Sequence, residues 1–415
     1  MTNTTTSGPE IHASVLQFLL NHGYMESVEA FKREARHQLD LLSSDESTDV
    51  QLINRLSQLQ IQRRVDELKD GDGDYFTTLT SDLLDIHYSN ILTVAIEPQT
   101  HILATSSIDK TVKISTMLCK SNTQIAPRTY SHHQAPVLSI EFHPRLPQLM
   151  LTTSMDGTSA LVNVSFEESL NDQEAEKVGL HQLFRDHKKY VVRGLFSPVE
   201  GKYIATASYD RTVCIYSMEQ EDEAQNLPNY KLIKQVGPFI GNVETICFVD
   251  EITLVIGVRD DNYLHYLNLE TMQQERINMN STGDDWVSFS PVYISVSSDG
   301  SQLLCTTDHD SGRTILFATG ESRQLQNYYI NATDNKFITR RHVWHPSGLY
   351  FYATGSDDNT ISVVETKSGR VITKLAGHKA MIRSLVLDSE LGLISAGYDH
   401  SVKLWSKPLN NLLIR

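Results

Sequence analysis

Three side chains near the end of the chain have the residue types of a nucleophilic triad, namely His378, Ser395 and Asp399. In a hydrolase, a histidine oriented by a carboxylate takes the proton of a serine hydroxyl, which then attacks the substrate. The sequence around Ser395 lacks the Gly-x-Ser-x-Gly elbow that exposes such a serine. Partial sets of the same residue types recur along the chain. Because one enzyme needs only one active site, this recurrence favours a packing role, and we expect neither catalytic residues nor a bound cofactor.

One recurring phrase accounts for these sets. It reads IATASYDRTVCIY at 204–216, and related phrases surround further aspartates, with weaker copies at the fourth and fifth positions. The turn aspartates are Asp109, Asp156, Asp210, Asp260, Asp310, Asp358 and Asp399. Their spacing ranges from 41 to 54 residues. Self-similarity at this period is typical of stacked units that cannot bury their apolar faces alone. The sequence therefore predicts a repeat protein of seven units.

Each unit has the pattern of four short strands. In the last unit, apolar runs at 382–387, 393–396 and 401–405 are separated by turn-forming residues. A four-stranded sheet repeated around an axis leaves only short, protected edges. We therefore expect an all-β, seven-bladed β-propeller. The segment 75–85 is placed to close the ring by pairing with 401–405, and 410–414 is the alternative closing strand. In the repeat family that these phrases resemble, an early strand usually completes the last blade, so we favour 75–85.

These residues resemble the WD-repeat (WD40) family, whose pattern is a Gly-His pair, a strand of small residues, a turn aspartate and a strand closing on Trp-Asp. The resemblance covers about residues 80–415, although Ser406 stands where the final aspartate usually lies. It implies a structural network in which the aspartate and a hydroxyl bond the imidazole, while the hydroxyl also accepts the indole proton. The matching residues in the last and third units are His378, Ser395, Asp399, Trp405, His187, Thr206, Asp210 and Tyr216.

The beginning of the chain has a different pattern. Apolar residues fall on one helical face, Gly23 interrupts them, and a second short helix runs to about Ala35. This stretch resembles the LisH (lissencephaly homology) motif, which implies a four-helix dimerisation bundle formed with a second copy. A helical hairpin that packs on its own propeller is the alternative. The expected dimerisation residues are Ile11, Val15, Phe18, Leu19, Tyr24, Val28 and Phe31.

A polar joint separates the two parts. The acidic stretch 41–49 is followed by a helical pattern that ends at Asp70-Gly71-Asp72-Gly73-Asp74. We therefore expect three regions, which are a LisH dimerisation motif at 1–36, a linker with a short helix at 37–74, and the propeller at 75–415.

Composition narrows the choice of partners. The chain of 415 residues has a formal net charge of −15 and 40% hydrophobic residues, so general attraction to nucleic acid or to an anionic membrane is disfavoured. The four cysteines, Cys119, Cys214, Cys247 and Cys305, lack zinc-ligand spacing, which argues against a metal site and a disulfide framework. With no signal-peptide pattern, we expect a cytoplasmic or nuclear protein.

The sequence therefore favours a non-catalytic scaffold that dimerises through LisH and binds proteins on the propeller face. Alternatives are a ubiquitin-ligase substrate receptor, a microtubule-motor regulator, and a nuclear corepressor or RNA-processing subunit. Aromatic residues and arginine are enriched at interface centres, which selects a candidate face. Its residues are Tyr209, Tyr398, Met155, Asp357, Arg193, Arg341 and Arg383.

Overall fold

The computed structural model describes residues 73–116, 128–164, 179–219, 227–330, 332–335 and 337–408. The expected LisH helices at 1–36, the linker helix and Cys119 lie outside the described residues, so these expectations stay predictions.

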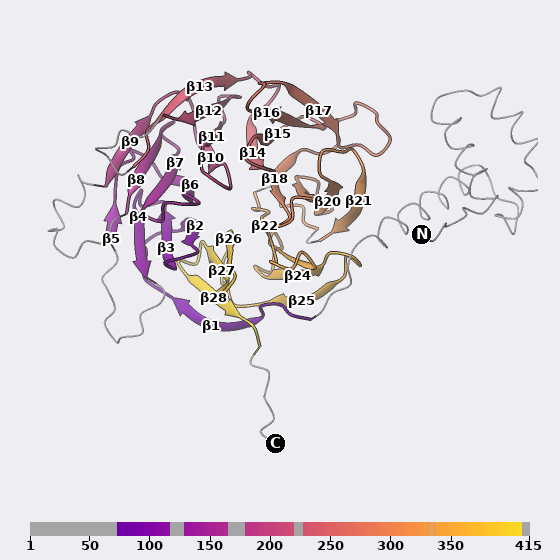
Figure 1. Cartoon of the computed structure of the whole chain (residues 1–415). Helices are drawn as coiled ribbons and strands as arrows, with labels where there is room; N and C mark the ends of the chain where they lie inside the picture. Colours follow the sequence, from indigo (N-terminus) through magenta and orange to yellow (C-terminus); the bar gives the residue numbers. More distant parts are fainter. Residues whose placement is uncertain are drawn as a thin grey trace, which may run out of the picture. The chain divides into compact units, whose positions relative to one another are not determined.

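The described chain forms seven four-stranded antiparallel sheets arranged as blades around a central axis (Figure 1). The strands of blades one to three are β2(Ile91–Glu97), β3(Ile102–Ser107), β4(Val112–Thr116), β5(Arg128–Tyr130), β6(Val137–Phe142), β7(Leu149–Ser154), β8(Ser159–Asn163), β9(Leu180–Phe184), β10(Val191–Phe196), β11(Tyr203–Ser208), β12(Val213–Met218) and β13(Tyr230–Val236). Those of blades four to six are β14(Val243–Phe248), β15(Thr253–Val258), β16(Tyr263–Asn268), β17(Gln274–Asn278), β18(Pro291–Val296), β19(Gln302–Thr307), β20(Arg313–Ala318), β21(Gln324–Tyr329), β22(His342–Trp344), β23(Tyr350–Ala353), β24(Ile361–Glu365) and β25(Val371–Leu375). Blade seven comprises β26(Ile382–Asp388), β27(Gly392–Gly397), β28(Val402–Ser406) and β1(Thr78–Leu83).

Each turn aspartate lies between the second and third strands of its blade, from Asp109 between β3 and β4 to Asp399 between β27 and β28. The weaker copies at Asp260 and Asp310 take the same place in blades four and five. The structure thus confirms the seven-bladed propeller.

Closure of the ring joins the two ends of the propeller. β1 pairs antiparallel with β28, with Leu79 opposite Trp405 and Leu83 opposite Val402. The buried Lys403 of β28 forms an ion pair with Asp82 of β1. The expectation that the N-terminal strand closes the last blade is therefore confirmed.

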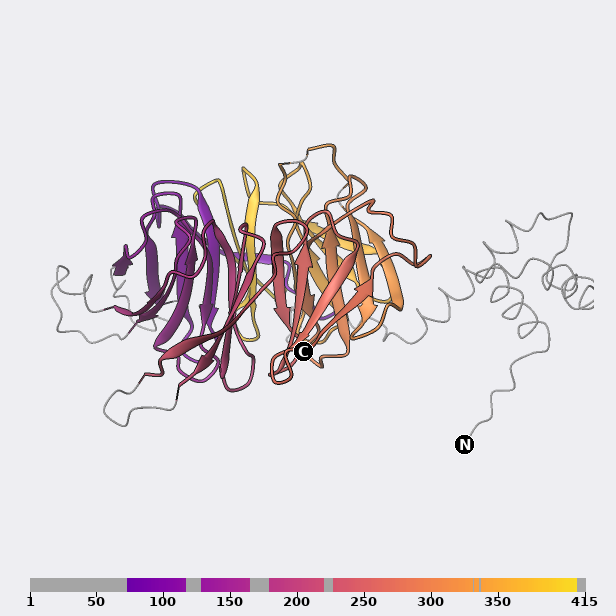
Figure 2. The same ribbon diagram turned by 90° about the horizontal axis from the view of Figure 1, so that it is seen from above.

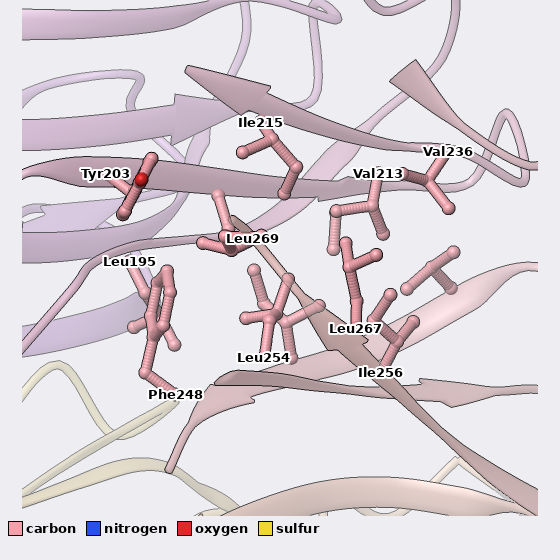
Figure 3. Packing of buried hydrophobic residues seen from close by; sticks show 14 of the residues in the cluster. Leu195, Tyr203, Val213, Ile215, Val236, Phe248, Leu254, Ile256, Leu267 and Leu269 are labelled. Atoms are coloured by element: carbon pink, nitrogen blue, oxygen red, sulfur yellow. The ribbon is translucent and has the colours of Figure 1, made fainter. Parts of the chain in front are cut away.

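Apolar clusters between neighbouring blades form the core. In Figure 3, Leu254 and Ile256 of blade four face Val213 and Ile215 of blade three within one buried cluster. Burying one such aliphatic side chain contributes about 1.5–3 kcal/mol to folding. Similar clusters join blades one and two, two and three, four and five, six and seven, and seven and one. At these six junctions, each blade therefore depends on its neighbour for the burial of the facing side of its sheet.

Strand direction gives the propeller two different faces, which Figure 2 presents from the side. In a four-stranded meander, the turn after the second strand and the loop after the fourth strand lie at the same end. We call this end the turn-aspartate face. Five of its inter-blade loops have six or seven residues, whereas the loops 279–290 and 330–341 have twelve each. Blades four to six therefore present the most extensive loops on this face.

Candidate functional site

The quartet of blade seven comes together in the structure. The imidazole of His378 lies 2.9 Å from Asp399 Oδ2 through Nδ1 and 2.8 Å from Ser395 Oγ through Nε2. The indole N–H of Trp405 donates to the same Ser395 hydroxyl at 2.9 Å. Ser395 is completely buried. Its hydroxyl is therefore engaged by two neighbours inside the blade and is not exposed to a substrate.

Blades one to three contain related networks. In blade three, His187 lies 3.0 Å from Asp210 Oδ2 and 2.9 Å from Thr206 Oγ1. Equivalent contacts involve His133 and Thr152 in blade two, and His87 with Thr105 and Asp109 in blade one. The sequence analysis missed His87, although it lies 22 residues before Asp109, close to the 23 residues that separate His187 from Asp210.

Tyr216 occupies the aromatic position of blade three but makes a different contact from Trp405. Its hydroxyl donates to Asp186 Oδ2 at 3.0 Å. Tyr216 thus contacts Asp186, the residue before His187, and its side chain also interacts with the hydroxyl of Thr206.

The networks hold the turn aspartates in their charged form. Burial by itself would raise the pKa of Asp399, but hydrogen bonds from His378, the Lys379 backbone and Ser401 outweigh it, and the pKa falls far below its usual range. The pKa of Asp210 is lowered in the same way, against the effect of burial, by His187 and Thr212. Each carboxylate accepts several bonds at once, which ties the turn to the loop that enters the blade.

Blades four to six depart from this arrangement. Asp358 of blade six binds Thr360 at 2.7 Å and Lys374 at 2.9 Å instead of a histidine. The buried His342 contacts Thr306 of the neighbouring blade at 2.7 Å. The fold of these blades is therefore retained without the histidine network.

The central channel contains two adjoining cavities. A cavity of about 730 Å³ lies at the turn-aspartate face and is lined by Met155, Tyr209, Arg341 and Arg383 among others; we call it the mouth cavity. A second cavity of about 610 Å³, the deep cavity, is lined by the inner strands and by Arg193. Arg341 and Arg383 line both cavities.

The structure thus brings five of the seven candidate face residues to the channel. Tyr398 and Asp357 line neither cavity, and Asp357 instead accepts a hydrogen bond from Thr333 at 2.9 Å. Sequence reasoning missed Tyr293 and Glu244, which line the channel from blades five and four. These two carry no signal in the repeat pattern, because channel positions differ from blade to blade.

Exposed apolar side chains gather on the turn-aspartate face. Trp286 is 77% exposed and Phe337 is 91% exposed, and they lie in the two long loops. Ile240 is 71% exposed in the loop between blades three and four. Other large apolar residues exposed on this face are Leu84, Tyr88, Ile108, Tyr190 and Val287. On the loops of the opposite face, Val199 is the one large apolar residue that is exposed within the described chain.

The loop that carries Trp286 is held by its own polar residues. Asp284 Oδ1 accepts a hydrogen bond from the Trp286 backbone N–H at 3.0 Å, and Asn280 Nδ2 donates to the Trp286 carbonyl at 2.8 Å. Asn262 of blade four donates to the Asp284 carbonyl at 3.2 Å. An exposed tryptophan on a loop fixed in this way is a preorganised contact residue.

The described ranges contain neither a candidate metal site nor a candidate membrane span. No group of three or more His, Cys, Asp or Glu side chains there is arranged to hold a metal ion. No helix in the same ranges is long and apolar enough to cross a bilayer. Cys214, Cys247 and Cys305 are buried free thiols.

Comparisons with known proteins agree with this architecture. The family model "WD domain, G-beta repeat" matches residues 77–114, 126–159, 179–217 and 369–406. These segments cover much of blades one, two, three and seven, which are the blades that carry the histidine networks.

Two named proteins are also similar to this chain. Transcriptional corepressor LEUNIG_HOMOLOG of Arabidopsis thaliana is 26% identical over 325 residues, covering 77% of this chain and 30% of that protein. Protein hir1 of Schizosaccharomyces pombe is 22% identical over 315 residues, covering 68% of this chain and 32% of the relative. The chain thus spans about a third of the length of these relatives. The chain thus carries four segments that match the WD40 repeat, and its described part is a seven-bladed β-propeller.

Proposed function

We propose that the protein is a non-catalytic scaffold that binds other proteins on the turn-aspartate face of its propeller. The observation that carries the proposal is the gathering of exposed Trp286, Phe337 and Ile240 on this face, while the opposite loops expose only Val199 among the large apolar residues described. Aromatic residues dominate the energetics of protein interfaces, and contiguous apolar exposure marks interaction sites.

The charged residues around the mouth cavity support a protein partner that carries both acidic and basic side chains. The residues that line the mouth cavity include both signs of charge, namely Arg259, Arg340, Arg341, Arg383, Glu244, Asp308 and Asp310. A rim of mixed charge favours a specific polypeptide over a uniformly charged polymer. The proposed footprint therefore comprises the two long loops, the loop of Ile240 and the rim of the mouth cavity.

The proposal includes dimerisation through residues 1–36, with 37–74 as a linker to the propeller at 75–415. Two tethered propellers raise the effective concentration of the second contact, so that modest affinities combine into a stable assembly. Leu19→Asp combined with Phe31→Asp should then yield a monomer with an unchanged propeller, measured by multi-angle light scattering and circular dichroism. An unchanged dimer mass would contradict this part of the proposal.

Among the possible assemblies we favour a nuclear corepressor-type complex. Its support is the similarity to a relative named as a transcriptional corepressor, which covers 77% of this chain. In this proposal the chain contributes protein contacts to a regulatory complex and makes no direct contact with nucleic acid or membrane.

Affinity purification of the full chain with quantitative mass spectrometry tests this function. We expect transcription-related proteins to be enriched, and we expect Trp286→Ser with Phe337→Ser to reduce their recovery at least about tenfold, as loss of interface hot spots does. The matched control is Val199→Ser, which removes a side chain that is 56% exposed on the opposite face. Recovery of ligase subunits or motor proteins instead would replace the corepressor assignment, and equal loss in the control would overturn the proposed face.

A further inference from the structure

Three arginines from three blades meet in the central channel. Arg193 projects from β10, Arg341 precedes β22, and Arg383 lies on β26, and all three line the deep cavity. Within the described chain, none of them forms an ion pair. A guanidinium stays charged at every physiological pH, so partly buried arginines without carboxylate partners leave positive charge uncompensated.

An aromatic ring and the backbone position these guanidinium groups. The Arg193 guanidinium lies 4.5 Å from the ring centroid of Tyr293, and that of Arg341 lies 4.9 Å from the same centroid. Arg341 Nη1 also donates to the Arg340 carbonyl at 3.0 Å. The Nε of Arg193 is buried and has no hydrogen-bond partner. Stacking on the ring leaves guanidinium edges available, which is the geometry that recognises oxyanions.

The carboxylates that face these arginines do not neutralise them. Glu244 is already engaged by Arg259 at 2.6 Å and by the Tyr209 hydroxyl at 3.0 Å. Glu97 accepts bonds from its own turn, including the backbone N–H of Gln99 at 3.0 Å.

Glu141 is the remaining acidic group that lines the deep cavity. Burial raises its pKa to about 7, although Arg193 acts in the opposite direction, so the carboxyl is substantially protonated at neutral pH. Burial and the neighbouring positive charge of Arg383 lower the pKa of Arg341 to about 9. This shift reflects the concentration of positive charge in the cavity. This electrostatic environment contrasts with the formal net charge of −15 of the whole chain.

We propose that the deep cavity is an oxyanion site, in which Arg193, Arg341 and Arg383 bind the phosphate group of a small ligand carrying at least two negative charges. The cavity volume of about 610 Å³ lies within the range of small-molecule sites. Because the arginines come from blade three and from the neighbouring blades six and seven, one bound anion would link blade three to blades six and seven across the channel.

Isothermal titration of the full chain with pyrophosphate tests the site. We expect saturable binding to one site per chain, and an affinity at least about tenfold weaker in Arg383→Gln, because each charge-assisted contact is strong. The matched control is Arg323→Gln, which removes the same charge from an exposed arginine that pairs with Glu321 outside the channel. Glu141→Gln should tighten binding at neutral pH by less than about threefold, because the carboxyl that it replaces is already substantially protonated there.

Further measurements distinguish loss of folding from loss of binding, and a free phosphate compound from a phosphorylated side chain. Thermal unfolding without ligand identifies any variant that fails to fold. If Arg383→Gln fails to fold, Arg193→Gln supplies a second probe.

A phosphoserine pentapeptide and its unphosphorylated form are titrated in parallel. Tighter binding of the phosphopeptide than of pyrophosphate would assign the phosphate to a partner side chain, and the reverse would assign it to a free compound. No binding of either probe, or equal weakening by Arg323→Gln, would overturn the site. The affinity purification of protein partners does not depend on anion binding. The proposed function and the proposed oxyanion site can therefore each fail without the other.

Discussion

In four blades, a histidine links the turn aspartate to the loop that enters the blade. Its contribution to stability depends on how many hydrogen bonds of its network are formed. In blade seven, Asp399 accepts bonds from His378, the Lys379 backbone and Ser401. In blade five, the equivalent Asp310 has no histidine at the corresponding place. The two aspartates therefore form a natural comparison within one molecule.

Asp399→Ala should lower the free energy of unfolding by about 1–3 kcal/mol, because it leaves the buried His378 without its partner. Asp310→Ala makes the same change at the same position of a blade without the network, and we expect a loss below about 0.5 kcal/mol. Urea unfolding followed by tryptophan fluorescence measures both. Equal losses in the two variants would show that the network is not what stabilises blade seven.

Buried histidines should make stability depend on pH. Burial, with the nearby Arg193 and Arg341, lowers the pKa of His342 to about 3, and burial lowers that of His143 to about 4. In the unfolded chain both titrate near 6.5, so below that pH the unfolded state binds more protons than the folded state. The stability that these two neutral histidines contribute is therefore fully present above pH 6.5. It is lost as the pH falls toward their pKa values in the folded protein.

His342→Gln removes one of these groups. The stability gap between the wild-type protein and this variant should narrow by up to about 1.4 kcal/mol per pH unit between pH 6.5 and 5. Urea unfolding at several pH values measures the gap. Parallel profiles of the two proteins would contradict a neutral, buried His342.

At the level of elements, strong and weak repeats fold alike because a blade needs only alternating apolar strands and a neighbour to cover them. Asp260 and Asp310 were recognisable from spacing, although their blades have lost the histidine pattern. The apolar pattern and the spacing of the aspartates therefore predicted the blades and their number, whereas the prediction of the closing strand rested on the family resemblance.

The site was less predictable for a physical reason. Arg193, Tyr293 and Arg341 come from three blades and meet only when the ring closes, so no local spacing indicates their contact. The exposure of Trp286 and Phe337 likewise depends on loop conformation, which periodicity does not encode.

The closing strand β1 gives a prediction at this scale. A chain of residues 73–415 should unfold cooperatively, because it keeps β1 on the edge of β28. A chain of residues 86–415 lacks this pairing and the Phe76 contact with Tyr352, whose hydroxyl accepts the Phe76 N–H at 2.8 Å. We expect it to lose cooperative unfolding in circular dichroism, since the ring no longer closes. Equal transitions in the two chains would contradict closure by β1.

At the scale of the whole molecule, the described chain forms a closed ring with two long loops on one face and three arginines in its central channel. Residues that fix the fold lie between blades, whereas residues with exposed apolar surface lie on the turn-aspartate face. This separation allows the contact surface to change without loss of the core, and it explains why blades four to six can diverge from the repeat pattern while they keep their strands.

Hydrogen exchange of the chain alone and in complex with its captured protein partner tests the central claim most directly. Backbone amides in 279–290 and 330–341 should exchange more slowly in the complex, because these loops form the proposed contact with the partner. The loop around Val199 on the opposite face should exchange at the same rate in both states. Protection confined to that opposite face or to the outer strands, with the two long loops unchanged, would contradict the account.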